Sequence, residues 1–213
     1  MYNPIPIKRS EQYYSNYWEG YSPKLKRDVD FFGDLNYEFW LLVETNPDIV
    51  NFCERPIIIE GVLNGKKLYS QFDMWLKWKD GRESFVKVIY SSKNTSSIRK
   101  LEETWCDSKN FEYIINTEKD IRKNSIELSN KKHLIRVIGR SSNPIETDRH
   151  IIKQLVTKEK RSISMIIEQI KNQVPLARIK EAIYWMIYEG SICSNVNERQ
   201  LSLETEVWIN VKT

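Results

Sequence analysis

The sequence predicts an α/β domain, with a mixed sheet flanked by helices, followed by a smaller domain of three helices and a two-stranded wing. Two observations predict this order. Strand-like and helical patterns follow one another as far as Gly139, whereas the remaining residues are mainly helical. Between the two parts lies a polar stretch that contains Pro144, so we expect domains at 1–143 and 144–213.

The first half of the first domain should contain a helix and two β-hairpins. Residues 1–30 are rich in Tyr, Ser and Asn, and we expect them to form an arm or loop. A buried helix is predicted at 35–45. It should end there because Pro47 follows, and proline disfavours a helical conformation of the residue before it. The hairpin strands are expected at 56–62 and 67–69, and at 72–78 and 84–90, each pair joined by a turn that contains glycine.

The second half of this domain alternates again between the two patterns. A helix is predicted at 95–106 and a strand at 111–115. Thr117 is followed three residues later by Asp120, an approximate capping box, so a helix should begin there. A further helix is expected through 131–138.

The second domain has a different plan, with helices expected at 146–156, at 163–170 and after Pro175. In the third helix, four apolar residues fall at i, i+4, i+7 and i+8 and define one buried face: Ile179, Ile183, Met186 and Ile187. Two strands, at 191–194 and 205–211, enclose a polar loop. Three helices with such a wing describe a winged helix-turn-helix.

Composition restricts the possible classes of protein. The 33 basic and 29 acidic side chains leave a small positive excess, which tolerates nucleic acid without demanding it. Cys53, Cys106 and Cys193 form neither a zinc pattern nor an even disulfide set, so a reducing, cytoplasmic location is expected. No apolar run is long enough to span a membrane. His133 and His150 lack partners nearby in sequence, so any metal would have to bind carboxylates.

Several stretches of the chain resemble the TnsA family when they are taken together. These stretches are distributed between residues 22 and 122: SPKLKRDV at 22–29, YEFWLLVETNPDIV at 37–50, ERP at 54–56, FDMWL at 72–76 and NTEKDIR at 116–122. The winged-helix tail also matches the second domain of that family. The resemblance implies a restriction-endonuclease-like domain in front of the winged helix.

The resemblance also implies a function. TnsA proteins cut the 5′ ends of a mobile element as one half of a heteromeric transposase, so we expect double-stranded DNA, a TnsB-like integrase and a TnsC-like ATPase as partners. The family's site uses carboxylates to hold Mg²⁺, which prefers oxygen ligands, and a lysine that steadies the attacking water and the phosphate. Mg²⁺ is therefore the expected cofactor if the nuclease site works.

The site residues match the family's pattern only in part. Asp73 matches the aspartate and is the expected metal ligand, but Lys87 stands at the Glu/Gln position and Ile89 at the position of the lysine. On the first helix the alignment puts Asn36 at the acidic position, while Glu38 is the nearest acid. Two residues along a helix turn a side chain by about 200°, so only one of the two can face the site.

A rearranged catalytic site would use three residues, namely Asp73, Lys87 as a migrated lysine, and Glu38 as a second carboxylate, for which Glu60 is an alternative. Because several site positions differ from the family's pattern, the sequence favours a weakened or inactive nuclease that binds DNA ends and partner proteins. Two alternatives stay open. One is a non-catalytic DNA-binding or interaction protein of a mobile element or phage, and the other is an RNA-processing nuclease.

Two basic groups are candidates for contact with DNA, because neutralising phosphates provides most non-specific affinity. One lies near the N-terminus, at Lys24, Lys26 and Arg27, and could equally be a solvated loop. The other lies where a winged helix enters the major groove, at Lys171, Arg178 and Lys180.

Overall fold

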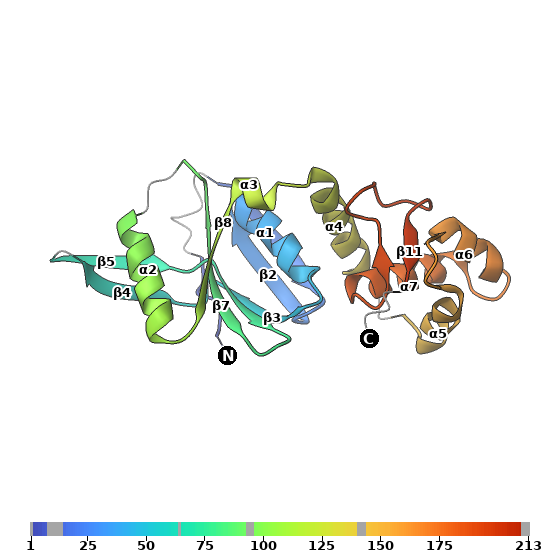
Figure 1. Ribbon diagram of the computed structural model, residues 1–213, viewed down its shortest axis with the longest axis horizontal. Helices are drawn as coiled ribbons and strands as arrows, with labels where there is room; N and C mark the ends of the chain where they lie inside the picture. Colours follow the sequence, from blue (N-terminus) through green and yellow to red (C-terminus); the bar gives the residue numbers. More distant parts are fainter. Residues whose placement is uncertain (1, 8–14, 64, 93–95, 140–143, 210–213) are drawn as a thin grey trace. The chain divides into compact units, whose positions relative to one another are not determined.

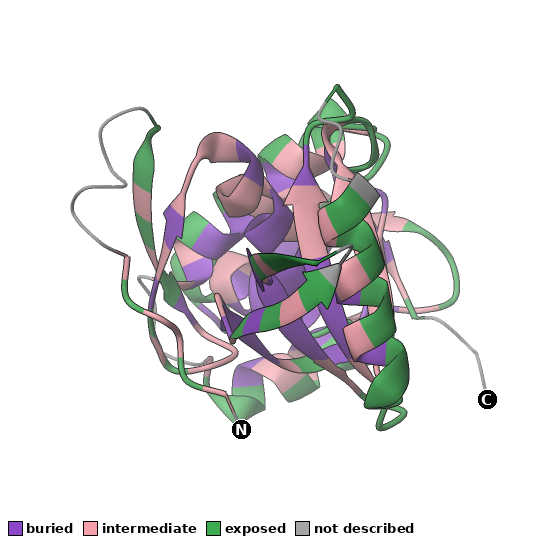
Figure 2. Ribbon diagram, turned by 90° about the vertical axis from the view of Figure 1, so that its left-hand side faces the viewer, coloured by how far each residue is buried: buried purple, intermediate pink, exposed green. Residues whose placement is uncertain are grey.

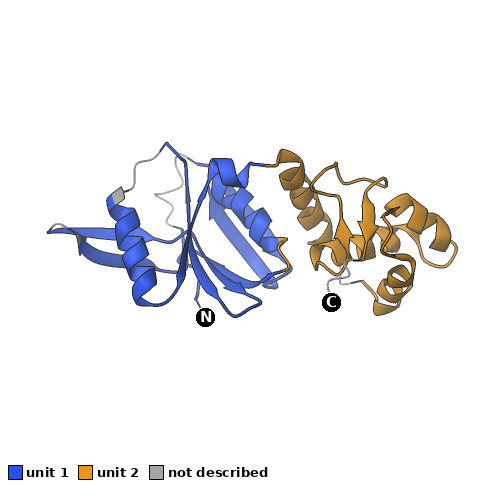
Figure 3. Ribbon diagram, viewed as in Figure 1, with its two compact units in different colours: residues 1–44, 48–123 blue, residues 45–47, 124–213 orange. Residues whose placement is uncertain are grey.

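The computed structural model describes residues 2–7, 15–63, 65–92, 96–139 and 144–209 (Figure 1). The chain forms two compact units, shown in different colours in Figure 3. Unit 1 comprises Met1–Glu44 and Asp48–Lys123, and unit 2 comprises Thr45–Pro47 and Asn124–Thr213. The break expected at 140–143 lies outside the described residues. The units divide before it, since the helix that precedes 140 belongs to the core of unit 2.

Unit 1 is a mixed α/β fold. In chain order its elements are β1 (Tyr17–Ser22), β2 (Arg27–Phe32), α1 (Asp34–Glu44), β3 (Ile49–Glu54), β4 (Ile58–Leu63), β5 (Lys66–Gln71), β6 (Met74–Trp78), β7 (Glu83–Ile89), α2 (Ser96–Ser108), β8 (Glu112–Thr117) and α3 (Glu118–Ile121). The helix expected at 35–45, both hairpins and the strand before Thr117 are confirmed. The capping box is confirmed as well, because the Thr117 amide donates to Oδ2 of Asp120 at 2.9 Å.

The central sheet of unit 1 has the strand order β3-β6-β7-β8. β3, β6 and β7 pair antiparallel, whereas β7 and β8 pair parallel and are connected through α2. A parallel pair needs such a crossover. The sheet is therefore mixed, as expected, and α1 and α2 lie on opposite sides of it (Figure 1).

Two features of unit 1 differ from the expectation. Residues 17–32 form the β1-β2 hairpin and not a loop, although residues 8–14 of the expected arm lie outside the described residues. Val29 and Phe31 of β2 are buried, while Asp28 and Asp30, which alternate with them, are more exposed. This alternation is a strand pattern, but the charged partners hide it in a search for apolar runs. β3 was also not predicted.

The core beside α2 connects the central sheet to the β4-β5 hairpin. Its buried members include Ile59 from β4, Phe85 from β7 and Cys106 from α2. Gly61 lets the hairpin approach α2 closely, because a Cβ atom there would collide with Leu101. In Figure 2, buried residues (purple) lie along the inner strands, and exposed residues (green) lie on turns and outer helix faces. The close packing of Gly61 against Leu101 therefore holds the β4-β5 hairpin against α2.

Unit 2 contains the helices and strands expected after Pro144 and two further elements. Its elements are α4 (Ser125–Ile138), α5 (Glu146–Leu155), β9 (Arg161–Ser162), α6 (Ile163–Ile170), α7 (Leu176–Tyr188), β10 (Cys193–Ser194) and β11 (Glu206–Trp208). The strands form an antiparallel sheet in the order β10-β11-β9. The short strand β9 was not predicted. α4 begins before the expected residue 131, because Asn124 caps it by accepting from the Glu127 amide at 3.1 Å.

One buried side chain fastens the loop between β10 and β11 to α4. Asn130, in α4, is 3% exposed. Its Nδ2 donates to the carbonyl oxygens of Val196 and Arg199, both at 2.7 Å, and its Oδ1 accepts from the Leu201 amide at 2.9 Å. A single amide therefore fixes three points of this loop.

Candidate functional site

A pocket of about 180 Å³ opens in unit 1 close to the start of β6. Its lining comes from the N-terminal segment, β2, α1 and the ends of β3 and β5, and consists of Ile7, Phe31, Phe32, Asn36, Arg55, Gln71 and Asp73. Segments far apart in the sequence thus bring together one carboxylate, two amides and one guanidinium. Asp73, the best match to the TnsA site, is among them.

The backbone hydrogen bonds of Asp73 fix the position of its carboxylate. Its amide donates to the Val86 carbonyl at 3.0 Å, and its own carbonyl accepts from the Arg55 amide at 2.9 Å. Oδ2 of the side chain accepts from the Val88 amide at 2.8 Å. Asp73 therefore continues the pairing of β6 with β7 by one residue and holds its carboxylate against the backbone of β7.

The Lys87 side chain, on β7, is 22% exposed and lies among polar groups. Its Nζ donates to the Gln71 carbonyl at 2.5 Å and lies 3.9 Å from Oδ2 of Asp73. The same Nζ lies 3.7 Å from Oε1 of Glu102 in α2. The structure thus brings Asp73 and Lys87 together, and it adds a carboxylate that the sequence analysis did not consider. Ile89, at the position of the family's lysine, is buried.

Glu102 is the buried centre of a hydrogen-bond network. Its side chain is 2% exposed. Ser70 donates its hydroxyl to Oε1, and Tyr113 donates its hydroxyl to Oε2 at 2.5 Å. Burial, and then the bond to Glu102, raise the pKa of Tyr113, so its phenol stays protonated and acts as the donor. Both oxygens of Glu102 are therefore engaged by protein groups.

The structure distinguishes between the two candidates on the first helix. Asn36 lines the pocket with Asp73, and its Nδ2 donates to the Phe32 carbonyl at 3.1 Å. Glu38 does not line it, and its Oε2 accepts from Nε of Arg122 at 2.7 Å. Because Asn36 and Glu38 are two residues apart on a helix, their side chains point in different directions. Glu60, the other candidate carboxylate, is exposed on β4 opposite Tyr69.

Arg55 lines the pocket, but its charge is already balanced. Its Nη2 lies 2.5 Å from Oδ1 of Asp30, its Nη1 donates to the Asp30 carbonyl at 2.6 Å, and its Nε donates to the Ile5 carbonyl at 2.8 Å. Arg55 also has a φ of 47°, a conformation that is uncommon outside glycine. These bonds hold the Arg55 guanidinium against Asp30 and the Ile5 carbonyl.

The described residues do not fit the Mg²⁺ site that the resemblance implies. Magnesium is usually bound through one or two carboxylates in an octahedron of oxygens. The pocket supplies one carboxylate, from Asp73, and Asn36 stands where a second would be needed. The oxygens of Glu102 are engaged elsewhere. Among the described residues, no group of three or more His, Cys, Asp or Glu side chains is arranged to hold a metal ion.

Most of the basic residues expected to contact DNA have intramolecular partners. In unit 1, Lys24 donates to the Val43 carbonyl at 3.0 Å, and Arg27 binds both oxygens of the buried Glu54 at 2.6 Å. The bond to Glu54 raises the pKa of Arg27. Lys26 is exposed at the turn between β1 and β2, with a φ of 55°.

The basic residues of unit 2 are divided in the same way. Arg178 binds both oxygens of Asp148, at 2.8 and 2.9 Å, and the Asp148 side chain is 4% exposed. Lys171 lies 2.5 Å from Glu168 in an exposed pair. Within the part of the chain that the structure describes, Lys180 has no ion-pair partner. Of the six residues, Lys26 and Lys180 therefore remain the best candidates to bind phosphate.

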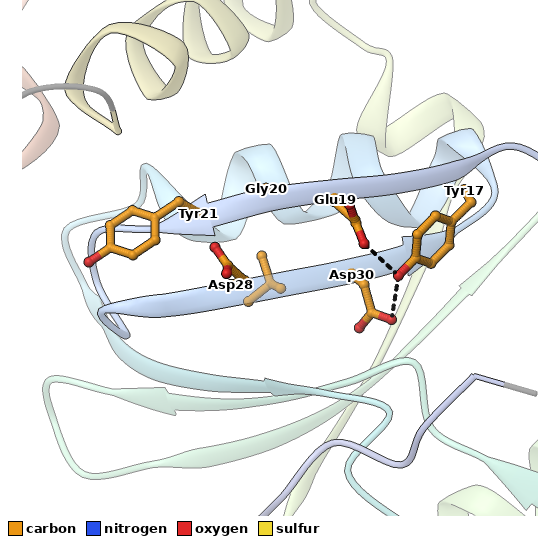
Figure 4. A pocket seen from close by; sticks show the side chains of 7 residues that line it. Tyr17, Glu19, Gly20, Tyr21, Asp28 and Asp30 are labelled. Atoms are coloured by element: carbon orange, nitrogen blue, oxygen red, sulfur yellow. Dashed lines mark hydrogen bonds between the residues drawn. The ribbon is translucent and has the colours of Figure 1, made fainter.

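A second hollow, of about 460 Å³, lies on the outer face of the β1-β2 hairpin (Figure 4). It contains the carboxylates of Glu19, Asp28 and Asp30 beside Tyr17 and Tyr21. Tyr17 donates to Glu19 at 3.1 Å and to Asp30 at 3.3 Å; desolvation and then these carboxylates raise its pKa to about 12. Such a face repels phosphate, which disfavours nucleic acid there.

Glu102 is the site residue that the sequence analysis missed, although the sequence contains a signal for it. Ile98, Leu101, Trp105 and Cys106 form the apolar side of α2, and Glu102 lies among them at helical spacing. A glutamate on an apolar helix face is unusual and indicates a buried partner. The identity of that partner, Lys87, depends on how α2 packs and is not encoded locally.

No family model matches the chain, and no curated protein is similar to it. Among the described residues, no helix has the length and apolar character that crossing a membrane requires.

Proposed function

We propose that the protein is a TnsA-like subunit of a heteromeric transposase that binds transposon DNA ends without cutting them. Unit 1 is then a restriction-endonuclease-like domain, and unit 2 is a winged helix-turn-helix with α4 added in front. The partners would be double-stranded DNA, a TnsB-like integrase and a TnsC-like ATPase. The evidence for this proposal is the resemblance in sequence, together with the arrangement of the elements and of the pocket.

The order of elements in unit 2 supports the second part of the proposal. α5, β9, α6, α7, β10 and β11 follow one another as helix, strand, helix, helix, strand and strand, and the third strand pairs between the other two. A winged helix has this order, and its third helix is the one that enters the major groove. The first turn of α7 is exposed at Leu176, whereas its second half, including Trp185, is buried.

The observation on which the non-cutting role rests is the amide of Asn36 beside Asp73 in the pocket. Cleavage in this class of site needs carboxylates that hold Mg²⁺ and a lysine directed at the phosphate. Here the second carboxylate is replaced by an amide. The ammonium of Lys87 is directed toward Gln71 and Glu102. The chemistry of the described pocket residues therefore differs from that of a nuclease site.

A working nuclease is the second candidate, and one distance favours it. Lys87 Nζ lies 3.9 Å from Oδ2 of Asp73, so a cation and a carboxylate are close together, as a migrated lysine would require. In that case Mg²⁺ would be the cofactor, and Asp73 would be its protein ligand.

A plasmid-nicking assay distinguishes the two candidates. The native protein, Asp73→Ala and Lys87→Ala are incubated with supercoiled plasmid and Mg²⁺ or Mn²⁺, with and without any integrase that a neighbouring gene encodes. Binding of duplex DNA is measured in the same samples, and the melting temperature of each variant confirms that it is folded. We expect DNA binding without nicking. Nicking that both substitutions abolish would establish the nuclease, and absence of DNA binding would contradict both candidates.

A further inference from the structure

The charges of the described residues beside the pocket restrict its ligand. Arg55 is paired with Asp30 at 2.5 Å, and the ammonium of Lys87 is shared between Asp73 at 3.9 Å and Glu102 at 3.7 Å. Among the described residues that line the pocket, a phosphate group would find no unpaired cation, and a metal ion would find a single carboxylate. An uncharged ligand that donates hydrogen bonds fits these charges best.

The walls of the pocket combine apolar surfaces with hydrogen-bonding groups. Ile7, Phe31 and Phe32 supply the apolar part. The side-chain amide of Gln71 makes no hydrogen bond within the described residues, and Oδ1 of Asn36 likewise has no donor there, since only its Nδ2 is used. Oδ2 of Asp73 accepts from the Val88 amide at 2.8 Å, and a carboxylate has about four acceptor positions in all.

The volume restricts the ligand further. About 180 Å³ holds roughly six water molecules at about 30 Å³ each, which is less than the pockets that enclose drug-sized ligands. A flat molecule of one ring fits this space. Its edge must carry a donor for Asp73 and groups that pair with an amide.

We propose that this pocket binds one unpaired pyrimidine base that carries an exocyclic amine, namely a cytosine at the end of the bound DNA. Carboxylates accept from the amino group of cytosine, amides pair with base edges, and apolar or aromatic walls stack on an extruded base. This inference rests on the proposed function. It assigns to the former nuclease pocket the recognition of a base in place of the scissile phosphate.

Fluorescence anisotropy with labelled duplexes tests the assignment. Blunt duplexes are compared with duplexes that end in a single unpaired C, T, A or G. We expect the C overhang to bind about tenfold more tightly than the blunt end, which is the effect of one well-formed base contact. Gln71→Ala should reduce this ratio at least threefold, whereas Gln169→Ala, at an exposed glutamine of α6, should leave it unchanged. Melting temperatures confirm that both variants fold.

The outcomes separate this inference from the proposed function. Equal binding of blunt and overhanging ends would overturn the base pocket and leave DNA-end binding in place. No binding of any duplex would overturn both. Free cytidine is added as a competitor to distinguish a base in DNA from a free nucleoside. Cytidine that binds as tightly as the overhang would overturn the assignment to DNA ends, and weak competition in the millimolar range supports it.

Discussion

Lys87 Nζ lies 3.7 Å from Oε1 of Glu102, and this contact joins the middle of the central sheet to the helix packed on it. The glutamate side chain is 2% exposed and the lysine side chain 22%. A buried carboxylate without a compensating charge is strongly destabilising. The lysine that the sequence assigned to catalysis therefore has a structural role that can be measured.

Lys87→Met should lower the free energy of unfolding by about 3 kcal/mol, because Glu102 is left buried without its cation. Urea titration at neutral pH measures this difference. Adding Glu102→Gln to Lys87→Met should restore part of the stability, since the stranded charge is removed. The matched control is Lys67→Met, at an exposed lysine of β5, which should change stability by less than about 0.5 kcal/mol. Equal effects at Lys67 and Lys87 would show that the buried pair does not stabilise the fold.

Asn36→Glu should create a binding site for a divalent cation in the pocket, because it places a second carboxylate beside Asp73. Electron paramagnetic resonance titration with Mn²⁺ measures binding directly. We expect no binding by the native protein and a single site in the variant, which Asp73→Ala should abolish. Mn²⁺ binding by the native protein that depends on Asp73 would contradict the interpretation of the pocket as a site without metal.

Lys26→Ala and Lys180→Ala should weaken binding of duplex DNA without lowering the melting temperature. Each should reduce the slope of log affinity against log salt by about 0.9, the contribution of one phosphate. Arg27→Ala and Arg178→Ala should instead destabilise the fold by about 2 kcal/mol or more. They leave the buried carboxylates of Glu54 and Asp148 unpaired. The salt dependence of DNA binding and the thermal unfolding of all four variants test this division between DNA-binding lysines and structural arginines. Unchanged slopes for both lysine variants would contradict the DNA-binding role of Lys26 and Lys180.

Only one of the three cysteines should react readily with iodoacetamide in the folded protein. Desolvation raises the pKa of Cys53 to about 11 and that of Cys106 to about 12, with a smaller contribution from Glu54 and Glu102 respectively. Near pH 8 both thiols are protonated, and the thiolate is the reactive form. Cys193 is partly exposed. Mass spectrometry of the alkylated protein should find Cys193 modified first. Equal labelling of all three cysteines before denaturation would show that Cys53 and Cys106 are not buried.

The Glu83–Lys77 ion pair should make a small, pH-dependent contribution to stability. The hydrogen bond from Lys77, and a weaker one from Trp75, lower the pKa of Glu83 below its ordinary value of 4.5. The contribution is therefore present above about pH 4.5 and is lost as the pH falls through the lowered pKa. Both side chains are partly exposed, so Glu83→Gln should lower stability by about 0.5 kcal/mol at neutral pH. In acid the native protein and Glu83→Gln should be equally stable. A difference in stability that persists in acid would show that this ion pair is not the cause.

Local signals in the sequence predicted those elements that depend on neighbouring residues. The helix before Pro47 and the capping box at Thr117 are of this kind. The β1-β2 hairpin was missed because its outward positions carry carboxylates that continue into the acidic hollow. The site shows the same division. Asp73 and Lys87 could be named from the sequence, but the choice between Asn36 and Glu38 required the rotation of α1, and Glu102 required the packing of α2 on the sheet.

The three hydrogen bonds of Asn130 have a consequence for the order in which unit 2 folds. They join residues 66 to 71 positions apart, so each closes a long segment of chain. Contacts of such separation form only after the intervening elements have collapsed, since the entropy lost in closing the segment must be recovered first. We therefore expect the loop between β10 and β11 to acquire its native conformation after α4 has docked, late in folding.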